Sequence, residues 1–134
     1  MQRTLALIAV SIACSGCAGQ SPNANGRSIF LTGKDVDGVQ ITAAAAPLRP
    51  YCAACHGANG AGGVHLPGGA VSADLRHRAL VTQQRHPYTL ALLERAISTG
   101  VDNDGKPLDP MMPRWELSAR DLHDVASYVL TQLK

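Results

Sequence analysis

Cys52-Ala53-Ala54-Cys55-His56 is the stretch from which the rest of the chain can be interpreted. A Cys-x-x-Cys-His run is typical of a covalent attachment site for c-type haem. The spacing suits the chemistry, because residues three and four apart lie on one face of a helical turn. Both thiols can then reach the two vinyl groups on one edge of the macrocycle, and His56 can ligate the iron as proximal ligand. We therefore predict one covalently attached haem c, held by Cys52 and Cys55.

The cysteine pair has two other interpretations. Cys-x-x-Cys also occurs in redox dithiols and in half-sites for zinc, and Cys14 and Cys17 repeat the spacing. A four-thiolate zinc site is disfavoured because Cys14 and Cys17 fall in an apolar leader. A thioredoxin-like dithiol lacks the βαβ pattern that would surround it. A non-haem zinc or dithiol module is therefore the weakest of the hypotheses.

Residues 1–16 have the layout of a secretory signal peptide, with Arg3 ahead of an apolar run. The run is too short to span a bilayer. Small residues before Cys17 are similar to a bacterial lipoprotein cleavage site, which predicts a lipid on Cys17 and attachment to a membrane. Ordinary cleavage with a soluble periplasmic product is the alternative. In both cases we expect an exported, periplasmic protein, in which the small and polar residues 17–28 form a flexible tether.

Removal of this leader leaves 118 of the 134 residues, with 11 of the 12 Lys and Arg residues against 10 acidic ones, a net charge of +1. Such a chain has no basic field for binding nucleic acid. Residues 29–134 are one domain in size. One Trp, one Phe and three Tyr supply few large side chains, so a covalently held haem would add apolar surface that the core needs.

Two stretches have the apolar periodicity of amphipathic helices. Residues 88–99 start with Thr89 as a capping residue and stop before Gly100. Residues 117–133 start with a Ser-x-x-Asp variant of the capping box and continue with an unbroken apolar face. These are the two helices that the sequence predicts best.

The segments between them are predicted to be shorter and less regular. Residues 43–46 are alanines and favour helix, and a short helix is expected around the haem cysteines, ending near Gly57. Residues 57–73 form a glycine-rich loop that can wrap the haem edge. Within it, the Pro67 carbonyl is a candidate acceptor for the Nδ1–H of His56. A further short helix is expected over residues 74–83.

A Thr-Gly-x-Asp-x-Asp-Gly sequence occurs twice, at residues 32–38 and 99–105. Asp and Gly at these places favour tight turns. A calcium loop would need further acidic ligands, including a Glu at its expected distance, and both copies lack them. We predict turns.

Asp109-Pro110-Met111-Met112-Pro113-Arg114-Trp115 precedes the last helix. A thioether sulfur is a soft ligand for haem iron. The flanking prolines stiffen the backbone and limit how far a methionine can move. A core-filling role is the usual alternative for methionine. The segment predicts a methionine as the sixth ligand.

The quoted motifs together resemble the class I (monohaem) c-type cytochrome family, bacterial periplasmic type, over about residues 29–134. The motifs are Cys52 to Gly57, Met112 to Trp115, Leu117-Ser118 and residues 126–130. The resemblance implies an all-α fold, a small helical domain wrapped around one haem. It also implies that Met112, directly before a proline, is the axial ligand, with Met111 as the fallback. The first and last helices would cross, with Tyr128 packed at the contact, although Pro47 and Pro50 depart from the usual long first helix.

The function that the resemblance implies is one-electron transfer, as a carrier or as the cytochrome subunit of a periplasmic redox complex, and not catalysis. Expected partners are redox proteins such as a dehydrogenase, an oxidase or another cytochrome. Trp115 and the glycine-rich loop would shield the ring. The alternative is a haem protein with an open or labile sixth site that acts as a small-ligand sensor or enzyme.

Overall fold

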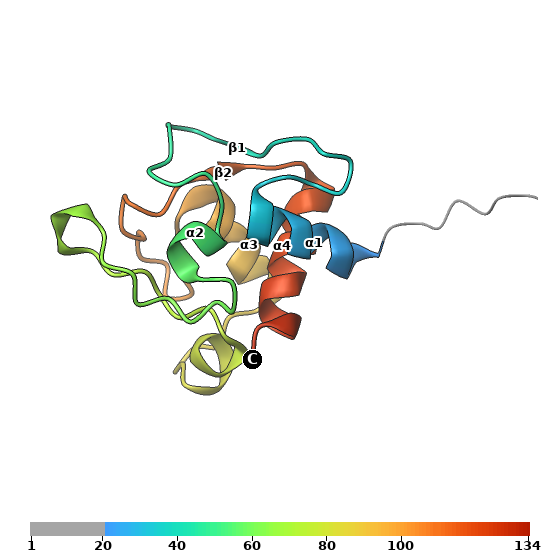
Figure 1. Cartoon of the computed structure of the whole chain (residues 1–134). Coiled ribbons are helices and arrows are strands. Elements are labelled where there is room, and N and C mark those ends of the chain that lie inside the picture. Colours follow the sequence, from blue (N-terminus) through green and yellow to red (C-terminus); the bar gives the residue numbers. More distant parts are fainter. Residues whose placement is uncertain (1–20) are drawn as a thin grey trace, which may run out of the picture.

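The computed structural model describes residues 21–134, and these form a small helical domain (Figure 1). The predicted signal peptide and Cys17 lie outside the described residues. Helices α1 and α3 pack against α4, loops and one-turn segments make up the other side, and a two-stranded pair lies at one end of the domain. In chain order the elements are α1 (Pro22–Thr32), β1 (Thr42–Ala43), α2 (Ala53–His56), η1 (Pro67–Gly69), η2 (Arg78–Thr82), α3 (Leu90–Thr99), β2 (Trp115–Glu116) and α4 (Ala119–Gln132). The predicted all-α class is confirmed.

Helix α1 crosses α4 at close range (Figure 1). Ser21 caps α1 by accepting from the N–H of Ala24, and Pro22 occupies the first turn, where its missing N–H costs nothing. Residues 22–28 therefore belong to a helix, although we predicted a flexible tether over residues 17–28. Their composition is that of a linker, but Asn25 and Gly26 are buried in the helix.

Asn25 gives the physical reason for that correction. Its side chain is fully buried, and its Nδ2 donates to Asp121 Oδ1 at 2.9 Å and to Asp124 Oδ2 at 2.8 Å. Its Oδ1 accepts from the N–H of Val36 at 3.0 Å. A small polar residue thus links α1 to α4 and to the turn that follows α1, which no local pattern reveals.

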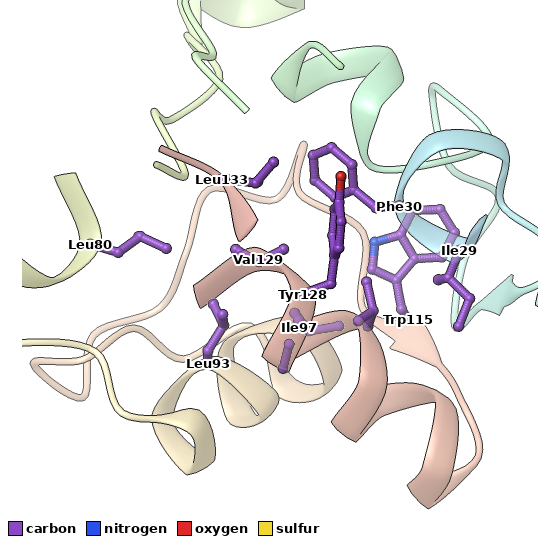
Figure 2. Packing of buried hydrophobic residues seen from close by; sticks show 11 residues of the cluster. Ile29, Phe30, Leu80, Leu93, Ile97, Trp115, Tyr128, Val129 and Leu133 are labelled. Atoms are coloured by element: carbon purple, nitrogen blue, oxygen red, sulfur yellow. The ribbon is translucent and has the colours of Figure 1, made fainter. Parts of the chain in front are cut away.

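The two best-predicted helices are confirmed as α3 and α4. Thr89 Oγ1 accepts from the N–H of Leu92, and Gly100 ends α3 in the left-handed conformation with φ +70°. Ser118 Oγ accepts from the N–H of Asp121 at the start of α4. Figure 2 shows side chains of α1, α3 and α4 converging on one core, with Tyr128 beside Phe30.

The alanines at 43–46 do not form the helix that their propensity favours. Ala43 instead pairs with Trp115, and Thr42 with Glu116, in the antiparallel β1–β2 pair. Helix propensity is weak compared with tertiary contacts, so the pairing decides the conformation here. This short sheet joins the segment before the haem cysteines to the segment after the methionines. The helix expected over residues 74–83 is also reduced, to the single π-type turn η2.

Both Thr-Gly-x-Asp-x-Asp-Gly sequences form the same turn, as predicted. Asp35 Oδ1 accepts from the N–H groups of Asp37 and Val39, at 3.0 and 2.7 Å. Asp102 Oδ1 accepts in the same way from residues 104 and 106, at 2.9 and 2.8 Å. Within residues 21–134 no group of three or more His, Cys, Asp or Glu side chains is placed to hold a metal ion. None of the helices in this range is long and apolar enough to cross a bilayer.

Candidate cofactor site

A cavity of about 500 Å³ lies between α2, the glycine-rich loop, α3 and the methionine segment. This volume falls in the range of cofactor pockets, roughly 300–1,000 Å³. The cavity brings together the predicted site residues Cys52, Cys55, His56, Met112 and Trp115. The other lining side chains are largely apolar, and those from α1, η2, α3 and α4 include Phe30, Leu80, Leu93, Ile97, Val125 and Val129.

The two cysteines reach the cavity because α2 is a single tight turn. The N–H of His56 donates to the Cys52 carbonyl at 2.9 Å, and Gly57 ends the turn with φ +77°. Desolvation by burial raises the pKa of Cys52 to about 12 and also raises the pKa of Cys55. A reactive redox dithiol requires a lowered thiol pKa. The surroundings therefore disfavour a free dithiol that cycles.

His56 is almost fully buried, and its Nδ1 lies 2.8 Å from the carbonyl oxygen of Ala73. Because a carbonyl can only accept, Nδ1 carries the proton and Nε2 keeps its lone pair. Desolvation lowers the pKa of His56, and the hydrogen bond to Ala73 opposes that shift. The imidazole is thus held neutral and oriented, as an iron ligand must be.

Pro67 is not the acceptor that we predicted. It lies exposed in η1, near the tip of a hairpin that the His65–Val71 bridge closes. The carbonyl that reaches His56 belongs to Ala73, after the hairpin has returned to the cavity. The general expectation of a loop carbonyl behind the histidine is correct, but the residue assigned to it is wrong.

Ser72 is a site residue that sequence reasoning missed. Its Oγ donates to the Cys55 carbonyl at 2.8 Å and accepts from the N–H of Val64 at 2.9 Å, and the residue is buried. Gly62 fits closely beside it, because a Cβ on Gly62 would lie 2.3 Å from the Ala73 oxygen. These contacts hold the returning strand of the loop against α2. A serine in a glycine-rich loop carries no sequence signal for this role.

Met111 and Met112 both line the cavity, and the structure distinguishes them by packing. Met112 packs against the buried core cluster, whereas Met111 does not belong to that contact set. Asp109 shapes the segment, because its carbonyl accepts from the Met112 N–H and its side chain accepts from the Met111 N–H. Trp115 is 4% exposed and belongs both to the core and to the cavity wall. This arrangement favours Met112 as the ligand.

The residues present fit a covalently bound haem. The cavity is mostly apolar, two thiols share one turn of its wall, and a neutral imidazole next to them offers a nitrogen. A second segment of the chain adds a thioether sulfur. One nitrogen and one soft sulfur are donor types that haem iron accepts.

Comparison with protein families shows that the chain matches the family model described as "Cytochrome c" over residues 24–132. The match includes every cavity residue named above, and it begins within α1, five residues before the predicted domain boundary at residue 29. No curated protein matches the chain.

Proposed function

Since the chain belongs to the cytochrome c family, we propose that it is a one-electron carrier whose haem iron has His56 and Met112 as axial ligands. Membership in the family confirms the fold and the covalently bound haem c, and it supports electron transfer in general. Family members are generally electron carriers and not enzymes. The assignment of the axial ligands is supported by the cavity, because an oriented imidazole and a methionine packed against the core both line it.

Each residue has a defined task in this proposal. Cys52 and Cys55 bind the haem, and when bound the haem supplies a ferrous–ferric couple. The Ala73 carbonyl fixes the His56 ring and makes its Nε2 a better donor. The Met112 sulfur and the mostly apolar walls favour the ferrous form, because an apolar site disfavours the extra positive charge of ferric iron. Trp115 and the glycine-rich loop exclude water from the ring.

We further propose export to the periplasm and a lipid anchor on Cys17. The support is the leader pattern of residues 1–16 together with the cofactor, since c-type haem is attached outside the cytoplasm in bacteria. The chain would act as a free carrier or as the cytochrome subunit of a redox complex. A dehydrogenase, an oxidase or another cytochrome would meet it through a small, transient contact.

Absorption spectra of the holoprotein test the ligand assignment. Met112→Ala is expected to abolish the weak methionine-to-ferric-iron charge-transfer band at the red end of the spectrum, and Met111→Ala is expected to keep it. A ferric wild-type protein that is high-spin would instead favour the sensor or enzyme alternative with an open sixth site. Mass spectrometry of the exported chain reports the covalent haem, the cleavage site and any acyl chains in one measurement.

A further inference from the structure

Arg114 lies behind the methionine segment and binds its backbone. Its Nη2 donates to the Leu108 carbonyl at 3.0 Å, and its Nη1 donates to the carbonyls of Asp109, at 3.3 Å, and of Met112. A guanidinium has five N–H donors in a rigid plane, so one side chain can serve several acceptors at once. A single arginine therefore gathers three carbonyls that span residues 108–112.

The same guanidinium is packed on the end of α3. A Cβ on Gly100 would lie 1.8 Å from Nε and 2.1 Å from Cζ of Arg114, so only glycine leaves room for it. Gly100 also contacts the methionine segment directly, because its carbonyl accepts a hydrogen bond from the Leu108 N–H at 2.8 Å. The partial negative charge at a helix C-terminus favours a cation at this place. Arg114 thus connects the methionine segment to a rigid helix end.

Arg114 acts from outside the haem cavity. Its neighbours Met111, Met112, Pro113 and Trp115 line that cavity, and Arg114 does not. Arg114 lines a second hollow, together with residues 44–48 and 110–113. Among residues 21–134, its side-chain hydrogen bonds go to these backbone carbonyls, and it is in no carboxylate ion pair. The arginine holds backbone in place and does not neutralise an acid.

We propose that Arg114 is a positioning residue that keeps the Met112 sulfur at the haem iron. The inference rests on the proposed His56 and Met112 ligation. A thioether is a weak ligand that an added base can displace once the backbone carrying it is free to move away. By fixing the carbonyls of Leu108, Asp109 and Met112, Arg114 opposes that movement. Lysine would keep the charge but lose the planar fork.

The affinity of the ferric holoprotein for imidazole tests the proposal, because imidazole must displace the sixth ligand to bind. In Arg114→Met we expect imidazole to bind about tenfold more tightly, since the loss of even one or two net hydrogen bonds is worth about that factor. Arg114→Lys should fall between this variant and the wild type. Gly100→Ala, which displaces the guanidinium while leaving it in the chain, should behave like Arg114→Met.

Arg120→Met is the matched control. Arg120 is a half-exposed arginine in α4 that pairs with Asp37 and Asp124, away from the methionine segment's carbonyls. Its loss should lower stability without changing imidazole affinity. Equal imidazole affinity in the wild type and Arg114→Met, with tight binding in Met112→Ala, would overturn the positioning role alone. Equal affinity in the wild type and Met112→Ala would overturn the axial assignment and this inference together.

Discussion

The rings of Phe30 and Tyr128 meet where α1 crosses α4, with centroids 5.7 Å apart and planes inclined by 49°. Gly26 and Asp124, which lie close together, each precede one of these rings by four residues, about one helical turn. A Cβ on Gly26 would lie 2.1 Å from the Asp124 carbonyl oxygen. The crossing therefore depends on a glycine at position 26, and the aromatic pair fills the space beside it.

Gly26→Ala should destabilise the holoprotein, although alanine is the better helix former. The clash with the backbone of α4 forces the helices apart, and overpacking of this kind costs about 1–3 kcal/mol, which exceeds the gain in helix propensity of about 1 kcal/mol. Unfolding in guanidinium chloride measures the free energy of unfolding of the variant and of the wild type, and the variant's value should be lower. Arg27→Ala, one residue along and exposed, should stay within about 0.5 kcal/mol of the wild type. A Gly26→Ala protein more stable than the wild type would contradict the close crossing.

Asn25→Ala should also lower the free energy of unfolding, for an electrostatic reason. The change leaves the Val36 N–H without its acceptor and the carboxylates of Asp121 and Asp124 without their common donor. A buried donor left unsatisfied costs about 1–3 kcal/mol. Asn23→Ala is the control, because Asn23 is exposed in the same helix. Equal unfolding midpoints for the two variants would show that the network contributes nothing.

Local pattern predicted the helices whose ends are marked in the sequence. Thr89, Gly100 and Ser118 perform the capping that their residue types indicate, and the pentapeptide at residues 52–56 indicated the cofactor. These signals succeed because cause and effect lie within one or two turns of helix. The same holds for the two Asp turns, whose hydrogen bonds connect residues two and four positions apart.

The features that the sequence did not predict depend on contacts between segments that are distant in the chain. Asn25 bonds partners 96 and 99 residues away, and Ala43 pairs with Trp115, so neither position could be interpreted from its neighbours. The Pro67 carbonyl is the predicted acceptor for His56, because the imidazole needs a carbonyl from this loop. In the structure the hairpin at residues 65–71 holds Pro67 at its tip, and the acceptor is the carbonyl of Ala73, which follows the hairpin. The axial role of Met112, the shielding role of Trp115 and the lipid on Cys17 stay predictions.

Asp74 provides a pH dependence whose sign follows from its surroundings. The Arg76 side chain donates to Asp74 and lowers the pKa of the carboxyl below its ordinary value of 3.8. A lowered pKa in the folded state adds stability above the unfolded pKa, and this stability is lost as the pH falls through the folded pKa. Asp74→Asn should therefore destabilise the protein at pH 7 by less than about 1 kcal/mol, because the pair is partly exposed. Below the lowered pKa the difference should vanish, which unfolding curves at a series of pH values can show.

Gly62→Ala should raise the reduction potential. The new Cβ would lie 2.3 Å from the Ala73 oxygen, at a glycine whose φ is +65°, so the acceptor of the His56 Nδ1–H must move. That hydrogen bond makes the imidazole a stronger donor and favours ferric iron. If it favours the ferric form by about 1 kcal/mol, its loss raises the potential by about 40 mV, at 59 mV per tenfold change for one electron.

Gly63→Ala separates this effect from backbone strain. Gly63 has φ +79° in the same loop, but a Cβ there would meet no atom within 4 Å. Both variants bear the left-handed penalty, and only Gly62→Ala displaces the carbonyl behind the histidine. Spectroelectrochemical titration of both holoproteins should therefore show a shift in the first variant and a potential close to the wild-type value in the second. Equal shifts in the two would mean that loop strain, and not the bond between His56 and Ala73, sets the change in potential.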